Sequence, residues 1–156
     1  MLFYGRRLAS EVTKILFVCH GNICRSPMAQ YIFGKLADEA GVGHCFEVES
    51  AATSREEIGN PVYPPARRML AAHGITKMDH RARQMDMDDY RYYDHIIVMD
   101  MENLYNARRM TGGDPDGKIE MLLDRQVDDP WYTDDFQTAY DDILEGCQEL
   151  LERLTD

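Results

Sequence analysis

The segment from Lys14 to Phe33, KILFVCHGNICRSPMAQYIF, decides how we expect the chain to fold. Its first five residues are a short, mostly apolar run that is typical of a β-strand. A polar loop follows Cys19, and residues 26–40 then carry apolar side chains at helical spacing, with Gly41 placed to end the helix. The segment therefore predicts a strand, a tight loop and a helix in succession.

The same alternation continues along the chain. Strand-like runs recur at 45–51, 95–100 and 118–123, and helix-like patterns recur at 64–74, 102–110 and 136–154. Because strands alternate with helices, we expect an α/β domain whose sheet is mostly parallel. Ligands of such sheets bind beyond the carboxyl ends of the strands, where the loops after three of the predicted strands would meet.

Length and composition indicate one globular domain over residues 1–156. Of the 156 residues, 44% are hydrophobic and 29% are charged. No apolar run approaches the roughly 20 residues that span a bilayer, and the N-terminus lacks the apolar region of a signal peptide. We therefore expect a cytoplasmic protein with no membrane partner. Residues 1–12 form an N-terminal extension to which the sequence assigns no role.

Charge and cysteine content narrow the possible partners. The formal net charge of −11 argues against nucleic acid, whose binding depends on lysine and arginine. An anionic substrate would need an attraction that is built locally, against the average field of the protein. In a cytosolic chain the four cysteines are expected to be free thiols: Cys19, Cys24, Cys45 and Cys147.

The loop after the first predicted strand has the features of an anion site. It joins a strand to a helix N-terminus, where unpaired backbone N–H groups and the positive end of the helix dipole point outward. Gly21 relieves steric limits on the turn, and Asn22 tolerates the left-handed conformation. Successive amides of this loop can therefore point toward one bound anion.

Side chains of the same loop add chemistry. Arg25 carries a planar guanidinium that matches phosphate oxygens, and Cys19 lies where positive surroundings favour its thiolate. Ser26 is placed to donate to the sulfur and to cap the helix, with Pro27 at the first helical position. A lone cysteine at a strand end is usually a packed apolar residue, and a lone arginine is usually solvated. Their joint spacing between strand and helix is more specific and indicates a functional site.

The stretch VCHGNICRSPMA (18–29) resembles the signature of the low-molecular-weight protein tyrosine phosphatases. Six further stretches follow in that family's order, namely ESAATS (49–54), IGNP (58–61), AAHGI (71–75), HRARQ (80–84), IIVMDMENL (96–104) and VDDPWY (127–132). The resemblance covers roughly residues 14–154. It implies an α/β three-layer sandwich with a four-stranded parallel sheet flanked by helices, in agreement with the predicted strands.

The resemblance also implies a hydrolase that works without metal or cofactor, by two phosphoryl-transfer steps. Cys19 would be the nucleophile, Arg25 would hold the phosphate oxygens and Asp129 would be the general acid, with Asp128 as a solvated neighbour. The substrate would be a phosphotyrosine-containing protein or peptide, and inorganic phosphate would be a product. No Cys/His cluster has zinc-ligand spacing.

Other positions receive roles by the same resemblance. The substrate-binding set would comprise His20, Gly21, Asn22, Ile23, Cys24, Ser26, Trp131 and Tyr132. A hydrogen-bond network supporting the loop would comprise Asn22, Ser26, Ser50 and His73. Cys24 would be able to pair with the nucleophile under oxidation. From the residues alone, Trp131 and Tyr132 could equally form an apolar patch, His73 a helix cap, and Cys24 a packed thiol.

Two positions depart from the family pattern at the rim of the site. Glu56 stands where the family often has an aromatic residue, and Tyr63 stands where Asp is common. These changes affect the expected peptide preference and leave the reaction centre intact.

Three alternatives share some of these features. A related arsenate reductase needs two further cysteines in a segment past the middle of the chain, and residues 80–94 contain none. A protein arginine phosphatase on the same scaffold typically has threonine where this chain has Ile23. A non-catalytic phosphate-binding module would not need Cys19, Arg25 and Asp129 together, and a redox module would favour a Cys-x-x-Cys motif.

Overall fold

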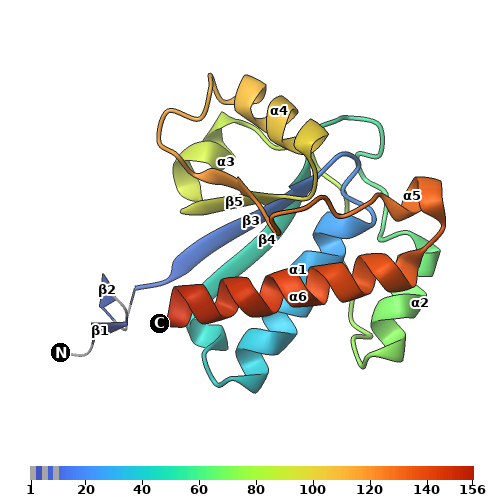
Figure 1. Ribbon diagram of the computed structural model, residues 1–156, viewed down its shortest axis with the longest axis horizontal. Helices are drawn as coiled ribbons and strands as arrows, with labels where there is room; N and C mark the ends of the chain where they lie inside the picture. The colour runs from blue at the N-terminus through green and yellow to red at the C-terminus, as the bar shows by residue number, and fades with distance from the viewer. Residues whose placement is uncertain (1–2, 5–6, 9–10) are drawn as a thin grey trace.

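The computed structural model describes residues 3–4, 7–8 and 11–156, with side chains from residue 11 onward (Figure 1). Residues 1–2, 5–6 and 9–10 of the predicted extension lie outside the described residues. Within its described part, β1 (Phe3–Tyr4) and β2 (Arg7–Leu8) pair in antiparallel fashion.

A four-stranded parallel sheet forms the centre of the molecule. Its strands are β3 (Thr13–Cys19), β4 (Phe46–Ala52), β5 (His95–Val98) and β6 (Ile119–Met121), in the spatial order β4-β3-β5-β6. The helices are α1 (Arg25–Glu39), the 3-10 helix η1 (Gly43–Cys45), α2 (Pro64–Ala72), α3 (Met87–Tyr92), α4 (Met101–Met110), α5 (Pro130–Thr133) and α6 (Phe136–Thr155). The predicted fold class is confirmed.

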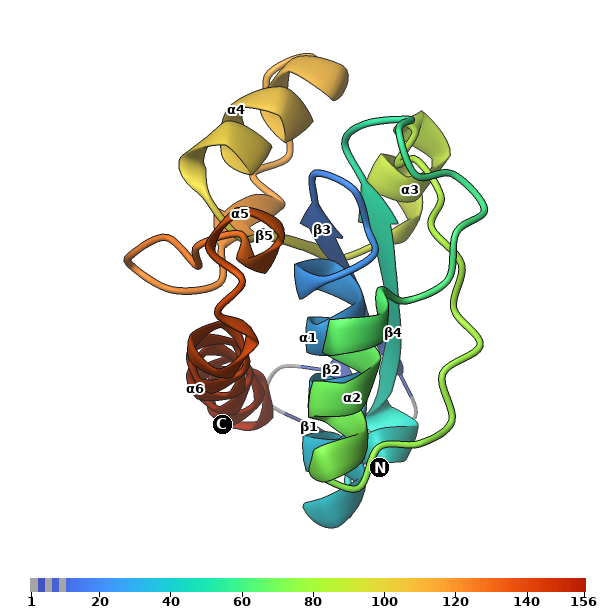
Figure 2. The ribbon, with the colours of Figure 1, turned by 90° about the vertical axis from the view of Figure 1, so that its right-hand side faces the viewer.

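Helices cover both faces of the sheet, which gives three layers. Helices α1, α2 and α6 lie on one face, and α3 and α4 lie on the other (Figures 1 and 2). Side chains along β3 point alternately to the two faces of the sheet. Ile15 and Phe17 belong to the core beneath α1 and α6. Leu16 and Val18 belong to the core beneath α3 and α4. A strand that is buried on both faces explains the continuous apolar run in its sequence.

The start of α1 differs from the prediction, and its end agrees with the prediction. The helix begins at Arg25 with Cys24 at the N-cap, and no side chain caps it, so the expectation that Ser26 caps the helix and Pro27 opens it is wrong. At the other end Gly41 has φ of +76° and follows the C-cap, as predicted. Its N–H donates to the Asp38 carbonyl at 3.0 Å.

Several local elements were absent from the sequence prediction, among them α3, α5 and η1. Helix α3 begins with a capping box, in which Asp86 accepts from the Asp89 N–H and the Asp89 side chain accepts from the Asp86 N–H. Helix α5 is a single short turn that begins inside the VDDPWY stretch and ends one residue after it. Cys45 lies in η1, one residue before the strand that was expected to contain it.

The packing of α6 against the segment after β6 generates a stability prediction. A β-carbon on Gly146 would lie 2.3 Å from Cγ of buried Leu122, whereas a β-carbon on Gly34 of α1 would meet nothing within 4 Å. We expect Gly146→Ala to lower the free energy of unfolding by about 1–3 kcal/mol through overpacking. Gly34→Ala should raise it by about 0.5–1 kcal/mol, because alanine is the better helix former. Urea unfolding of both variants checks this, and equal effects would contradict the packing described.

Candidate active site

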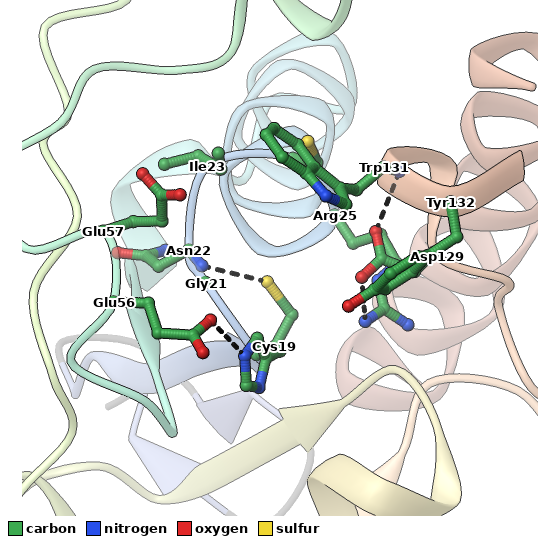
Figure 3. Close-up of a pocket in the computed structure, with 12 residues that line it drawn as sticks. Cys19, Gly21, Asn22, Ile23, Arg25, Glu56, Glu57, Asp129, Trp131 and Tyr132 are labelled. Atoms are coloured by element: carbon green, nitrogen blue, oxygen red, sulfur yellow. Dashed lines mark hydrogen bonds and ion pairs between the residues drawn. The ribbon is translucent and has the colours of Figure 1, made fainter. Parts of the chain in front are cut away.

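A pocket opens at the carboxyl edge of the sheet, where the loops after β3, β4 and β6 meet (Figure 3). The residues that line it are Cys19, His20, Gly21, Asn22, Ile23, Cys24, Arg25, Glu56, Glu57, Asp129, Trp131 and Tyr132. The structure thus brings together Asp129 and the cysteine loop, which we define as residues 19–25 and which lies about a hundred positions earlier in the sequence. Apart from Ser26, every residue predicted for catalysis or substrate binding lines this pocket.

Hydrogen-bond donors surround the sulfur of Cys19. The Asn22 N–H donates to Sγ at 3.3 Å, and the Ser26 hydroxyl lies 3.0 Å from it. Asn22 adopts φ of +61°, the left-handed conformation that was expected for it. Gly21, in contrast, is not among the residues with positive φ. A negatively charged sulfur would be stabilised by these donors and by the start of α1.

The Asn22 side chain fixes this loop conformation through four hydrogen bonds. Its amide nitrogen donates to Ser26 Oγ at 2.8 Å and to Ser50 Oγ at 3.0 Å. Its oxygen accepts from His80 Nε2 at 2.7 Å and from the Arg83 N–H at 3.2 Å. Because all its donors and acceptors are used, the fully buried Asn22 is held in a single orientation.

The prediction that His73 belongs to this network is wrong. His73 is the C-cap of α2 and stacks on Tyr140, with ring centroids 4.0 Å apart and planes 13° from parallel. His80 takes the expected place, 2.7 Å from Asn22 and 3.2 Å from Ser50. It belongs to the HRARQ stretch, whose position along the chain was noted without any role being assigned to its histidine.

His80 is neutral in this environment. Burial, followed by the positive charge of Arg83, lowers its pKa to about 4. Its Nε2 faces the Asn22 carbonyl oxygen, so the proton of the neutral ring is placed on Nε2. The network therefore keeps the same protonation state throughout the neutral pH range.

Arg25 is fixed by three oxygen acceptors although its side chain is buried. Nη1 donates to Asp100 Oδ2 and to the Val127 carbonyl, each at 2.7 Å, and Nη2 lies 3.4 Å from Asp129 Oδ2. Burial opposes the charge, but the negative groups of Cys19, Asp129 and Asp100 outweigh it and raise the pKa of Arg25 above its usual value. The guanidinium is therefore a permanent cation with a fixed orientation.

Asp100 is a residue that sequence reasoning missed. Met99 separates it from the end of β5, and its other oxygen caps α4 by accepting from the Asn103 N–H at 2.7 Å. The available signal was an acidic residue at the end of the apolar run 95–100, at the edge of the sheet where the cysteine loop was expected.

Asp129 and the two aromatic residues after it form another side of the pocket. Asp129 Oδ1 accepts from the Trp131 N–H at 3.0 Å and so caps α5, while Oδ2 faces Arg25 (Figure 3). Trp131 is 51% exposed and Tyr132 is 81% exposed. Tyr63 packs against Trp131, with ring centroids 4.9 Å apart, so this departure from the family pattern supports the aromatic wall.

The other cysteines differ from Cys19 in their surroundings. Burial and then the charge of Cys19 raise the pKa of the Cys24 thiol well above its usual value, and burial alone does so for Cys147. Cys45 and Cys147 are buried apolar residues, and all four thiols are free, as expected. The surroundings of Cys24 and Cys147 therefore favour neutral thiols.

A sulfur surrounded by donors, a fixed guanidinium and a carboxylate in one pocket define a cysteine-dependent phosphatase. A family model described as "Low molecular weight phosphotyrosine protein phosphatase" matches residues 14–156. The chain belongs to this family.

Individual relatives agree with this assignment. The chain is 41% identical to the low molecular weight phosphotyrosine protein phosphatase of Gallus gallus, over 93% of this chain and 98% of that protein. The crystal structure of YfkJ from Bacillus subtilis superimposes with a TM-score of 0.89 at 37% identity, over 92% of this chain and 94% of that one. The structure of DARP, titled a Drosophila arginine phosphatase, gives a TM-score of 0.85 at 30% identity, over 92% and 99%.

Within 11–156, no three His, Cys, Asp or Glu side chains are grouped so that they could hold a metal ion. No helix in the described part of the chain combines the length and apolar character that a membrane span requires.

The contact between Asp100 and Arg25 generates a prediction. Asp100→Asn keeps an N-cap for α4 but removes the charge that faces the guanidinium. We expect kcat/KM for an aryl phosphate to fall at least about tenfold, since hydrogen bonds to charged groups contribute about 1.5–3 kcal/mol. Asp86→Asn makes the same change at the N-cap of α3 and should leave kcat/KM unchanged. Equal kinetics for both variants would contradict a role for Asp100 in orienting Arg25.

Proposed function

We propose that the protein hydrolyses phosphotyrosine residues of other proteins in two steps, with Cys19 as nucleophile, Arg25 as phosphate ligand and Asp129 as general acid and base. One observation carries the proposal: the sulfur of Cys19, with its two donors, lines the same pocket as the fixed guanidinium and the Asp129 carboxylate. Family membership supports the reaction class.

In the first step the Cys19 thiolate attacks phosphorus, and the bond from phosphorus to the tyrosyl oxygen breaks. Asp129 gives its proton to that oxygen, so tyrosine leaves as the neutral phenol. Arg25 and the N–H groups of the cysteine loop bind the phosphoryl oxygens, whose charge is spread in the transition state. The product of this step is a cysteinyl phosphate.

In the second step water attacks the phosphorus of the cysteinyl phosphate. Asp129, now ionised, takes a proton from the water, and the bond from phosphorus to sulfur breaks. Inorganic phosphate leaves, and the Cys19 thiolate is restored. The hydrogen bonds from Asn22 and Ser26 to the sulfur support this step, because they stabilise the thiolate that leaves.

The pocket walls favour an aromatic leaving group. Trp131 and Tyr132 offer exposed ring surface on one side of the mouth, and Ile23 offers an apolar side chain at the cysteine loop. A flat aryl ring fits between such walls, which supports phosphotyrosine as the substrate class.

Protein arginine phosphatase is the second candidate, because the DARP structure is a close match in fold. Ile23 argues against it, since an apolar residue offers no hydrogen bond to a guanidinium. Arsenate reduction is disfavoured by residues 80–94, which contain no cysteine and supply His80 and α3 instead.

Two further features belong to the proposal. Cys24 is the candidate partner of Cys19 under oxidation, because both free thiols line the same pocket. The cytoplasm is the proposed location, since four free thiols are typical of a reducing compartment.

The nucleophile is tested by Cys19→Ser. We expect this variant to lose turnover of para-nitrophenyl phosphate while it still binds vanadate or phosphate, because Arg25 and the loop amides remain. Cys45→Ser, a change of the same kind away from the pocket, should keep full activity. Steady-state kinetics and calorimetric phosphate binding measure both, and turnover retained by Cys19→Ser would exclude the mechanism.

The general acid is tested by Asp129→Asn, which keeps the N-cap of α5 but carries no proton to donate. We expect kcat/KM for phenyl phosphate to fall about 10²–10³-fold, and that for para-nitrophenyl phosphate to fall less, because its leaving group needs less protonation. The exposed neighbour Asp128 provides the control, because Asp128→Asn should leave kcat/KM unchanged for both substrates. Equal losses on both substrates would remove Asp129 from this role.

A further inference from the structure

Two glutamates form the side of the pocket mouth that the mechanism leaves unused. Glu56 and Glu57 lie in the loop after β4 and line the pocket across from Trp131 and Tyr132 (Figure 3). We call Glu56 and Glu57 the acidic rim. Neither residue contacts Arg25 or Asp129 in the interactions described above, so the rim has no part in the chemical steps.

The Glu56 carboxylate is held in place at the mouth. Its Oε2 lies 2.6 Å from His20 Nε2, while 68% of its side chain remains exposed. The backbone beneath it is tied to the cysteine loop, because the Thr53 N–H donates to the Cys19 carbonyl at 2.9 Å and the Ser54 N–H donates to the His20 carbonyl at 3.1 Å. Glu56 is thus both accessible to a substrate and fixed relative to the nucleophile.

Glu57 lies against the cysteine loop itself. A β-carbon on Gly21 would be 3.4 Å from Cγ of Glu57, an ordinary contact distance, so the Glu57 side chain lies directly beside the loop. The carboxylate accepts a hydrogen bond from Asn60 Nδ2 at 2.5 Å. Both carboxylates of the acidic rim therefore have defined positions beside the entrance.

The charges at the mouth are unbalanced. Among the pocket-lining residues the permanent cation is Arg25, which is 1% exposed and already faces Asp100 and Asp129. Arg55 belongs to the loop that carries Glu56 and Glu57, and Arg81 donates a hydrogen bond to the Gly59 carbonyl of that loop. Neither arginine lines the pocket. A substrate approaching the entrance therefore meets carboxylates first and the guanidinium only inside.

We propose that the acidic rim determines substrate specificity, by selecting phosphotyrosyl peptides with a lysine or arginine beside the phosphotyrosine and rejecting peptides with acidic neighbours. The inference rests on the proposed function, because it places the phosphotyrosine in the cysteine loop. The phosphate reaches Arg25 and the loop amides, while the neighbouring cation is attracted to Glu56 and Glu57. An acidic neighbour is repelled by the same carboxylates, which adds discrimination.

The experiment measures kcat/KM for three phosphotyrosyl peptides whose flanking residues are lysine, alanine or glutamate. At low ionic strength we expect the lysine peptide to exceed the glutamate peptide by about tenfold, since two partly exposed carboxylates contribute modestly each. In 0.5 M salt the ratio should shrink, because the Debye length falls below the roughly 10 Å of 0.1 M salt. A ratio near one at low ionic strength would overturn the inference.

Charge variants separate the acidic rim from the overall charge of −11, which would also favour basic peptides. Glu56→Gln and Glu57→Gln should each reduce the lysine-to-glutamate ratio about threefold. Glu152→Gln removes the same charge from an exposed position on α6 and should leave the ratio unchanged. Equal reductions in all three variants would overturn the inference, since the preference would then come from the general field.

The outcomes distinguish the two proposals. Turnover of all three peptides at similar rates would contradict the acidic rim alone and leave the proposed function standing. Failure to hydrolyse any phosphotyrosyl peptide or para-nitrophenyl phosphate would contradict the proposed function and the inference together. Hydrolysis of phosphoarginyl peptides with no activity on phosphotyrosyl peptides would also contradict both the proposed function and the inference.

Discussion

A nearly completely buried guanidinium has to be matched by fixed acceptors, and the arrangement of the site depends on how this is achieved for Arg25. Asp100 lies two residues after the end of β5, Val127 lies two residues before Asp129, and Asp129 is the N-cap of α5. Asp100 belongs to the segment after β5, whereas Val127 and Asp129 belong to the segment between β6 and α5. The interactions that stabilise the buried cation therefore also hold Asp129 beside the cysteine loop.

This local arrangement resolves the conflict between an acidic protein and an anionic substrate. The net charge of −11 repels a phosphate at long range, but salt screens that field beyond about 10 Å at 0.1 M. Inside the pocket the loop amides, the start of α1 and Arg25 act at close range. The exposed carboxylates of the acidic rim lie at the mouth of the pocket, outside the position of Arg25. At this place they would interact with the charged residues that flank the phosphotyrosine of a substrate.

Patterns within single segments predicted most of the fold. The apolar run of β3 reflects its burial on both faces, and the left-handed conformations of Asn22 and of Gly41, the residue after the C-cap of α1, follow from local residue chemistry. The network partner could not be derived this way, because His80 lies 58 positions from Asn22 and only the folded chain shows that it reaches there instead of His73. Asp100 was missed for the same reason, since 75 positions separate it from Arg25.

The central claim is that Cys19 carries the phosphoryl group during turnover. Acid quenching of the enzyme in the middle of a reaction with para-nitrophenyl phosphate, followed by peptide mapping with mass spectrometry, tests it directly. We predict one phosphate on the peptide that contains Cys19, and none when Cys19→Ser is treated in the same way. Phosphate on Cys24 or His20, or turnover without any phosphorylated peptide, would contradict the account.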